Sequence, residues 1–257
     1  MHISGLFYYP IKSGAGVALD VAQLDLRGIV GDREYMVVDV EGTFLTQREA
    51  PKLALVSWRA PEVVTPIGAA VVESGHARQV TVWDFAGPAL DCGDAAAEVL
   101  SDFLGRSCRL VKTPQGHARR SDDGRTGVGF ADGYPLLLIG QASLADLNSR
   151  LPQALPMNRF RPNVVVSGSD PYAEDQWRRV LLGEVPAQVV KPCARCAITR
   201  VDQATGVRGD GEPLRTLGGF RKVKGGVIFG QNVVHDALGT LRIGDEVSPL
   251  GDPAPRS

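Results

Sequence analysis

Short runs of apolar residues, separated by Gly, Pro and Asp, dominate the pattern of hydrophobic and polar positions along the chain. The runs are rich in Val and Ile, which favour strands, and the residues that bound them favour turns. We therefore expect a mainly β protein. The expected strands lie at residues 5–9, 34–40, 53–58, 79–82, 109–112, 163–166, 189–192, 197–201, 227–232 and 246–250.

Only two segments have a convincing helical pattern. In the first, Asp94 precedes AAAEVLSDFL and Gly105 follows it, the usual places for a helix N-cap and for the glycine that ends a helix. In the second, Ser143 precedes LADLNSRL, whose leucines share one face at helical spacing. The expected fold class is therefore α+β, mainly β with a few helices.

The segment TPQGHARRSDDGRTGVG, residues 113–129, is polar and rich in glycine, and we expect it to be a long loop or a linker. It divides the chain into domains at residues 1–112 and 113–257, both rich in strand-like runs. We expect β-barrels in both, because barrels close the edges of their sheets. The tail from residue 251 onward is expected to be disordered.

Composition narrows the class of protein. Among 257 residues, 28 Lys and Arg balance 29 Asp and Glu, so no positive field attracts nucleic acid or an anionic membrane. No apolar run reaches the roughly 18 residues of a spanning helix, and the N-terminal segment does not have the pattern of a signal peptide. Four cysteines are too few for a disulfide scaffold in this chain. We expect a cytoplasmic protein with reduced thiols that binds neither nucleic acid nor a membrane.

Common catalytic motifs are missing from the sequence. There is no GxxxxGK[ST] and no GxGxxG after a strand, which argues against a P-loop and against a Rossmann dinucleotide site. The four histidines do not have HExxH spacing, and no GxSxG nucleophile motif occurs.

The strongest local feature is KPCARCAITRVDQATG, residues 191–206, which holds Cys193 and Cys196 in CxxC spacing. Taken alone, it has three interpretations. It could be half of a zinc site that needs two more ligands, a redox pair, or two buried structural cysteines. A redox pair usually begins a helix, whereas the β-branched residues that follow predict a strand here. A lysine and two arginines flank the thiols, and such a setting favours the thiolate, a soft ligand for a thiophilic metal.

Three other segments have the character of anion-binding sites. YPIKSGAG places Lys12 and Ser13 after a strand, followed by small residues that let a ligand approach the backbone. GDREYMVVD places Arg33 at the mouth of a strand, and NRFRPNVVVSG places Arg159 and Arg161 just before one. Arginine is well suited to bind a phosphate with two hydrogen bonds. A single segment of this kind is commonly a solvated strand end. The inference of an anion-binding site therefore depends on the three segments together.

Together these motifs resemble a known family. YPIKSGAGV, GIVGDREYMVVDVEGTFLTQRE and PKLALV are similar to the N-terminal β-barrel domain that precedes MOSC domains. FADGYPLLLIGQASLADLNSRL, NRFRPNVVVSG, YAEDQW, KPCARCAITRVDQATG and FGQN are similar to the MOSC domain, which is named from the C-terminal part of molybdenum-cofactor sulfurases. The resemblance covers nearly the whole chain, and the architecture is similar to that of the mitochondrial amidoxime-reducing component and its bacterial counterparts.

The resemblance implies a molybdopterin molybdenum cofactor whose metal binds one protein thiolate, Cys196, with Cys193 as a neighbour. It implies that Cys196 and Asp132 are catalytic, Asp132 as a candidate proton donor. The cofactor-binding residues that it implies are Lys12, Ser13, Arg33, Tyr134, Arg161, Asn163 and Cys196. Residues 46–48 match a family stretch near the site, without a firm role.

The activity that the resemblance implies is the reduction of N-hydroxylated compounds by a molybdopterin-dependent oxidoreductase. We expect a separate electron-transfer protein as donor (a ferredoxin, a flavoprotein or a cytochrome b5-like protein), because the chain lacks the cysteines of an iron–sulfur domain. The alternative is a carrier that binds the cofactor, or ferries sulfur on Cys196 as a persulfide, without its own turnover. Pyridoxal phosphate has been suggested for the family by analogy, and we do not expect it here.

Overall fold

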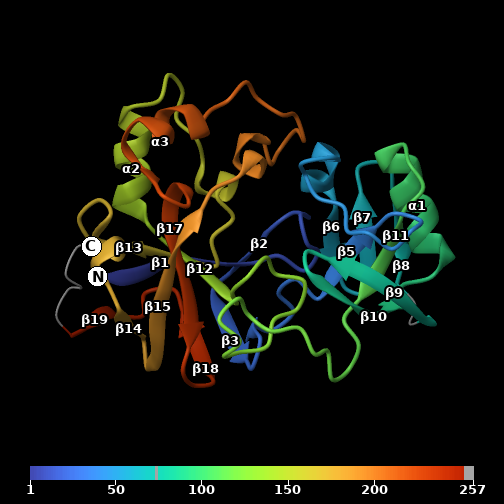
Figure 1. The fold of residues 1–257 in the computed structure, drawn as a ribbon, viewed down its shortest axis with the longest axis horizontal. Helices are drawn as coiled ribbons and strands as arrows, with labels where there is room; N and C mark the ends of the chain where they lie inside the picture. Colours follow the sequence, from blue (N-terminus) through green and yellow to red (C-terminus); the bar gives the residue numbers. More distant parts are fainter. Residues whose placement is uncertain (73–74, 252–257) are drawn as a thin grey trace.

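The protein has two lobes, which lie side by side in Figure 1. The computed structural model describes residues 1–72 and 75–251, so residues 252–257, and with them most of the tail expected to be disordered, lie outside the described residues. The predicted class, mainly β with a few helices, is confirmed. None of the helices in the described part of the chain is long and apolar enough to cross a membrane.

The larger lobe is built on one curved sheet. Its strand order is β19 (Val247–Leu250), β14 (Arg179–Leu182), β15 (Val185–Ala194), β17 (Gly226–His235), β12 (Leu136–Gly140), β13 (Val164–Ser167), β1 (His2–Tyr8) and β2 (Val17–Leu19). The backbone N–H of Val247 donates to the carbonyl of Met1 (3.0 Å), and His2 forms a β-bridge with Glu246. These contacts bring β1 back to β19, so the sheet closes as a barrel around one apolar core.

Residues 1–29 belong to this lobe by their pairing. β1 pairs with β13, and β3 (Val21–Asp25) pairs with β18 (Gly239–Arg242) and with β4 (Gly28–Ile29). Such long-range pairing cannot be recognised from the local sequence pattern. The domains predicted at residues 1–112 and 113–257 stay a prediction, and these strand pairs cross that boundary.

The smaller lobe holds two small sheets and a helix. The first sheet has the order β5 (Tyr35–Val38), β11 (Arg109–Lys112), β10 (Phe85–Asp91) and β9 (Ala77–Val82). The second contains β6 (Ser57–Arg59), β7 (Glu62–Thr65) and β8 (Gly68–Val71), and α1 (Asp94–Leu104) packs on both. As predicted, α1 ends at Gly105 in the left-handed conformation, while its N-cap is Gly93 rather than Asp94.

Two strand predictions were wrong in whole or in part. Residues 51–55 form the 3₁₀ helix η1 (Pro51–Leu55), so only the end of the expected strand at 53–58 is extended, in β6. The segment expected as a strand at 197–201 is the 3₁₀ helix η4 (Ala197–Arg200), which Cys196 precedes. The hydroxyl of Thr199 donates to the carbonyl of Cys196 (2.9 Å), and this local bond competes with extended backbone.

The helix predictions also needed correction. α2 (Gln141–Ser149) begins before Ser143, whose hydroxyl binds the carboxylate of Glu174 inside the lobe instead of capping the helix. A third helix, α3 (Leu214–Phe220), was not predicted, because its sequence LRTLGGF is short and contains two glycines.

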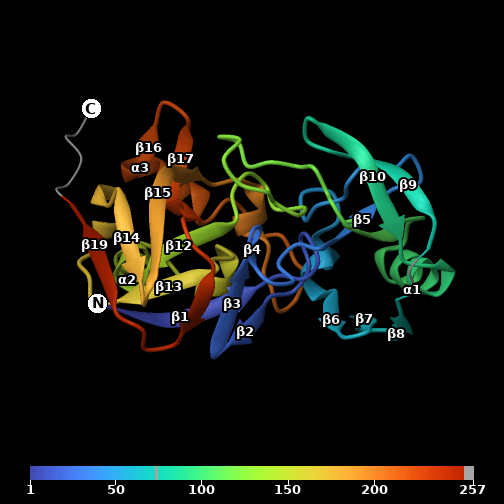
Figure 2. The same ribbon diagram turned by 90° about the horizontal axis from the view of Figure 1, so that it is seen from below.

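Five residues, each in or next to one of five neighbouring barrel strands, lie on one line across the sheet. This line positions the site. Lys191 pairs with Asn232 and Asn232 with Leu137. The backbone N–H of Asn163 donates to the carbonyl of Leu137 (2.8 Å), and that of Phe7 donates to the carbonyl of Asn163 (2.9 Å). Residues 8–14, 131–135, 159–162 and 192–196 lie just beyond this line. They therefore meet at the barrel edge that faces the smaller lobe (Figure 2).

Candidate functional site

All of the predicted site residues line one cavity at the barrel edge that faces the smaller lobe. The cavity contains about 750 Å³ not filled by atoms, including its open side. Segments from both ends of the chain contribute to its wall. The predicted residues that line it are Lys12, Ser13, Arg33, Asp132, Tyr134, Arg161, Asn163 and Cys196.

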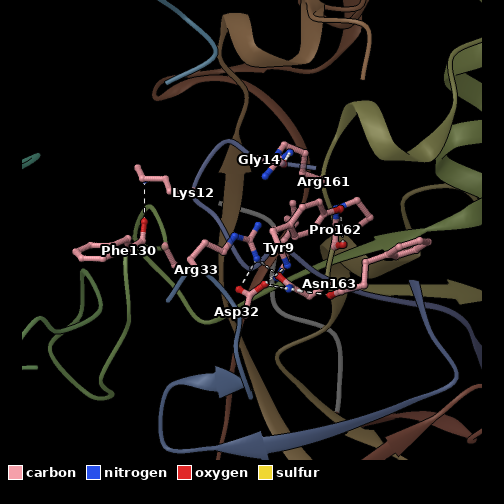
Figure 3. A network of polar contacts seen from close by, with 12 residues as sticks. Tyr9, Lys12, Gly14, Asp32, Arg33, Phe130, Arg161, Pro162 and Asn163 are labelled. Atoms are coloured by element: carbon pink, nitrogen blue, oxygen red, sulfur yellow. Dashed lines mark hydrogen bonds and ion pairs between the residues drawn. The ribbon is translucent and has the colours of Figure 1, made fainter. Parts of the chain in front are cut away.

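The buried end of the cavity, formed by Tyr9, Arg33, Arg161 and Asn163, is organised around the ring of Tyr9 (Figure 3). The guanidinium carbons of Arg33 and Arg161 lie 4.4 Å and 4.2 Å from the centre of that ring. The Tyr9 hydroxyl donates to the carbonyl of Pro162 (3.1 Å), and burial raises the pKa of Tyr9 to about 12. A neutral aromatic ring thus holds two cations close to each other through cation–π contacts.

Arg33 is fixed by a carboxylate and an amide. Its NH1 donates to Asp32 Oδ2 (2.5 Å) and to Asn163 Oδ1 (3.1 Å). The Asn163 amide also donates to Asp32 Oδ1 (3.2 Å) and to the carbonyl of Phe7 (3.1 Å), and its oxygen accepts from the N–H of Leu137 (3.2 Å). Every hydrogen-bonding position of Asn163 is therefore used within the protein. It orients Arg33, and its predicted contact with a cofactor stays a prediction.

Arg161 has no carboxylate partner among the described residues. Its NH1 donates to the carbonyl of Gly14 (2.6 Å) and to Gln203 Oε1 (3.3 Å), and the residue is only 9% exposed. Burial lowers the pKa of Arg161 to about 10, so the side chain is still charged at neutral pH. A buried cation with only neutral partners is unfavourable unless an anion joins it. A side chain on Gly14 would approach Ile11 Cβ and the Val56 carbonyl to 2.9 Å, which accounts for glycine there.

The backbone is strained at three residues that line the cavity. Five residues other than glycine have a left-handed φ in the described part of the chain, and three of them are Ser13 (63°), Arg33 (50°) and Arg161 (57°). Such a conformation is unfavourable by about 1–3 kcal/mol and persists where surrounding contacts fix it, often at ligand sites. A fourth, Trp83 (52°), lies at the open side.

Lys12 and Asp132 form an ion pair at the border between the cavity and solvent. Lys12 is 4% exposed, and its ammonium also donates to the carbonyl of Phe130 (2.9 Å), whereas the side chain of Asp132 is 64% exposed. Desolvation raises the pKa of Asp132, but the charges of Lys12, Arg33 and Arg48 outweigh it and hold that pKa below its usual range. Asp132 is thus ionised at neutral pH, and its predicted role as proton donor stays a prediction.

The glycine-rich segment after β11 supplies part of the cavity wall. Residues 113–135 contain no helix or strand, in agreement with the expected loop at 113–129. Arg119 is buried and donates to the carbonyls of Gly129 (3.0 Å), Ala131 and Asp132 (2.7 Å). These bonds hold residues 131–134 against the cavity.

The two thiols of the CxxC segment both line the cavity, with different neighbours. Arg195 NH1 lies 3.0 Å from Cys193 Sγ, and its NH2 donates to the carbonyl of Phe160 (2.6 Å). Of the flanking cations, Arg195 is therefore the one directed at a thiol, and the thiol is that of Cys193. Cys92 and Cys108 are buried in the core of the smaller lobe, so they do not complete a zinc site with this pair.

Arg159 does not bind an anion in the way that its motif predicted. It is 7% exposed, and it donates from Nε to the carbonyl of Thr199 (3.0 Å) and from NH2 to that of Arg200 (2.9 Å). These carbonyls end η4, the short helix that follows Cys196. Arg159 therefore positions the Cys196 segment, whereas Arg161, two residues later, faces the cavity.

Gln47 and Gln203 form a contact between the lobes that sequence reasoning missed. Their side-chain amides bind each other reciprocally, at 3.0 Å and 2.9 Å, and Gln47 also donates to the carbonyl of Ser13 (2.8 Å). Gln203 is the residue that accepts from Arg161. The only sequence signal was that both glutamines lie inside motifs already singled out, TQRE and VDQATG.

The chemistry of the lining fits an anionic ligand that carries a thiophilic metal. The cations Lys12, Arg33, Arg161 and Arg195 line the cavity together with a single carboxylate, Asp132, and with two thiols. Within residues 1–72 and 75–251, no group of three or more His, Cys, Asp or Glu side chains is placed to hold a metal ion. A metal bound here through a thiolate would take its remaining ligands from a bound chelate.

Comparison with known proteins places this geometry in a family. Residues 125–248 match the MOSC domain, and residues 1–107 match the MOSC N-terminal beta barrel domain. The chain is 34% identical to human mitochondrial amidoxime-reducing component 1, over 97% of this chain and 83% of the relative. It is 35% identical to bovine mitochondrial amidoxime reducing component 2, over 95% and 82%.

A longer relative matches the same region. The chain is 30% identical to the molybdenum cofactor sulfurase of Arabidopsis thaliana, over 96% of this chain and 35% of that protein. The two domain matches, together with relatives aligned over nearly the whole chain, establish that the protein belongs to the MOSC family, with a MOSC N-terminal beta barrel domain ahead of its MOSC domain.

Proposed function

We propose that this protein is a molybdopterin-dependent oxidoreductase that reduces N-hydroxylated compounds, with electrons from a separate protein. Its relatives named as amidoxime-reducing components support the reaction class. The observation that carries the proposal is the buried, charged Arg161, which has only neutral hydrogen-bond partners among the described residues and lines the same cavity as Cys196. An anionic cofactor with a thiophilic metal satisfies both groups at once.

Each part of the cavity has a role in this proposal. The Cys196 thiolate would bind the metal, and Lys12, Ser13, Arg33 and Arg161 would hold the pterin and its phosphate. When bound, the cofactor supplies two-electron redox chemistry at its metal. Tyr9 and Asn163 keep Arg33 and Arg161 in place before the cofactor arrives, so little reorganisation is needed on binding.

Protons must reach the cavity from solvent during the reduction. Asp132 is the lining carboxylate, and it contacts Lys12 inside while most of its side chain is exposed. We assign it to proton transfer in combination with water, as a carboxylate that is ionised at rest and accepts a proton only transiently while the proton passes inward. The donor protein's identity and the cytoplasmic location remain predictions.

The experiment that tests this function compares the two neighbouring thiols. Both variants, Cys196→Ser and Cys193→Ser, are produced in a host that makes the molybdenum cofactor. We then measure their molybdenum content and their reduction of an amidoxime with a chemical reductant. We expect Cys196→Ser to lose the metal and the activity, and Cys193→Ser to keep most of both. Full metal content in Cys196→Ser overturns the assignment of the ligand.

A carrier function is the second candidate, because a molybdenum cofactor sulfurase matches over nearly the whole chain. In that case Cys196 would hold sulfur as a persulfide and the protein would not turn over a substrate. Mass spectrometry of the intact protein, with and without a thiol reductant, separates the two. A reducible sulfur addition at Cys196, without amidoxime reduction, supports the carrier.

A further inference from the structure

A second, wider cleft continues the cavity toward solvent. It contains about 1460 Å³ not filled by atoms, including its open side, and shares Asp132, Tyr134, Cys193 and Cys196 with the cavity. Its far wall comes from the smaller lobe, from Arg48 and from the β9–β10 hairpin. We call this region the mouth, and its members are Arg48, Trp83, Asp84, Phe85, Asp132 and Lys191.

Trp83 occupies a position in the mouth where tryptophan is unfavourable. Val82 pairs with Phe85, so Trp83 and Asp84 form the two-residue turn of the hairpin. Trp83 has a φ of 52° there, and hairpin turns with such a residue favour Gly or Asn. The residue is also 41% exposed. A bulky, exposed residue with a strained backbone indicates a role other than the stability of the fold.

The ring of Trp83 is nevertheless held in one orientation. Its Nε1–H donates to Asp132 Oδ1 (3.3 Å), and its centre lies 4.7 Å from the ring centre of Phe44. The guanidinium carbon of Arg48 lies 5.0 Å from the same ring, and Lys12 Nζ lies 5.7 Å away. An oriented and partly exposed aromatic ring at a cleft that reaches Cys196 is a platform on which a planar ring can stack.

We infer that Trp83 determines specificity by stacking on the ring of planar aromatic N-hydroxylated compounds, while the N–OH group enters the cavity toward Cys196. This inference rests on the proposed function, and it adds a substrate class to it. Aliphatic compounds with the same N–OH group lack a ring for Trp83 to contact. The side chain should therefore discriminate between the two kinds.

The test measures binding to the cofactor-loaded protein by calorimetry without a reductant, with benzamidoxime as the aromatic probe and acetamidoxime as the aliphatic probe. Trp83→Asn removes the ring and suits the left-handed turn, so the variant should fold. Trp83→Phe keeps a ring without the N–H. Phe220→Asn is the matched control. Phe220 ends α3, away from the mouth, and is 37% exposed, and the guanidinium carbon of Arg150 lies 4.3 Å from the centre of its ring.

We expect Trp83→Asn to weaken benzamidoxime binding about tenfold and acetamidoxime binding by less than about twofold. Trp83→Phe should stay within about threefold of the unmodified protein, since a smaller ring still stacks. Phe220→Asn should change neither. In addition, benzamidoxime should quench tryptophan fluorescence in the unmodified protein, and this quenching should be reduced in Trp83→Phe.

Two results overturn the inference. One is benzamidoxime binding that Trp83→Asn leaves unchanged, or that is undetectable in the unmodified protein. The other is an equal loss for both probes, which means that the ring only maintains the shape of the mouth. Failure of the proposed function has a different signature, namely no molybdenum in the unmodified protein or no reduction of either compound by it.

Discussion

The buried end of the cavity and its mouth are built in opposite ways. At the buried end, Arg33 and Arg161 flank the ring of Tyr9, a residue that is 2% exposed, and Asn163 has no hydrogen-bonding position left for a ligand. At the mouth, Trp83 is 41% exposed, and Lys191 meets Asp122 in an exposed ion pair at 3.4 Å. The buried end is held mainly by contacts within the protein, and the mouth leaves surface free for another molecule.

This difference indicates which part of the site suits cofactor binding and which part suits the choice of substrate. A rigid set of cations binds an anion with little loss of conformational entropy, which suits a cofactor that stays bound. Exposed side chains on a hairpin turn can change with little effect on the fold, which suits the choice of substrate. We therefore expect mutations at the buried end to affect cofactor content and folding, and mutations of the hairpin residue Trp83 to affect substrate binding alone.

The largest effect should follow replacement of Arg161. We expect Arg161→Met to reduce molybdenum and pterin content to less than about a tenth, because the buried cation that faces the anion is lost. The unfolding free energy of the cofactor-free protein should fall by no more than about 1 kcal/mol, since an unpaired buried charge is also removed. Elemental analysis and urea unfolding measure the two quantities.

The matched control is Arg150→Met at the C-cap of α2, where the arginine side chain is 48% exposed and pairs with Asp146. It should leave cofactor content unchanged. Full cofactor content in Arg161→Met would show that the cofactor does not depend on this cation, and it would remove the main support for the buried end as an anion site.

Removal of the Asn163 amide should have the next largest effect. Asn163→Ala removes one hydrogen bond from each of Arg33, Asp32, the Phe7 carbonyl and the Leu137 N–H, and we expect a loss of about 3 kcal/mol in the free energy of unfolding. Urea unfolding of the cofactor-free protein measures it. Asn148→Ala is the comparison, since that half-buried amide bonds only to the backbone of Leu155 and should lose about 1 kcal/mol. Equal losses in the two variants contradict the special role of Asn163.

A pH effect should follow from His117, which packs between Phe85 and Phe130 beside the mouth. Burial, aided by Arg27 and Arg119, lowers the pKa of His117 from 6.5 to about 4. Its neutral form is therefore favoured in the folded state, and stability should fall by about 2 kcal/mol as the pH drops from 6.5 to 4. His117→Phe should reduce this loss, and His76→Gln, at an exposed position, should not. An unchanged pH profile in His117→Phe would exclude this histidine as its cause.

The smallest effect should come from the exposed ion pair at the mouth. We expect Lys191→Met to change the free energy of unfolding by less than about 0.5 kcal/mol, because solvent screens the pair with Asp122. Thermal and urea unfolding both measure this change. A loss above about 1 kcal/mol would mean that the mouth contributes to folding, and the contrast with the buried end would weaken.

The predicted site residues line one cavity because several of them lie at strand ends. Lys12 follows β1, Arg161 precedes β13, and these two strands run antiparallel, so their motifs meet at one edge. The family resemblance supplied Cys196 at the end of β15. Nothing in the local pattern showed that β1 closes the barrel of the C-terminal half, because that pairing spans more than 150 residues.

The other differences between the sequence-based predictions and the structure have local causes. Ile198 and Thr199 favour a strand by propensity, but the Thr199 hydroxyl and the Arg159 guanidinium bind carbonyls of this segment and stabilise a 3₁₀ turn. Arg159 and Arg161 have the same motif and nearly the same burial, and only packing decides which one faces the cavity. Trp83 was missed because it belongs to no motif, and its importance comes from a turn conformation and from a neighbour, Asp132, in a distant loop.

The most direct test of the central claim is the cofactor content of the unmodified protein. The protein is purified from a host that makes the molybdenum cofactor, molybdenum is measured by elemental analysis, and the pterin is released as its fluorescent oxidation product. We expect about one molybdenum and about one pterin per chain, because one thiol and one set of cations define a single site. A protein that is folded but contains neither molybdenum nor pterin above background contradicts the claim.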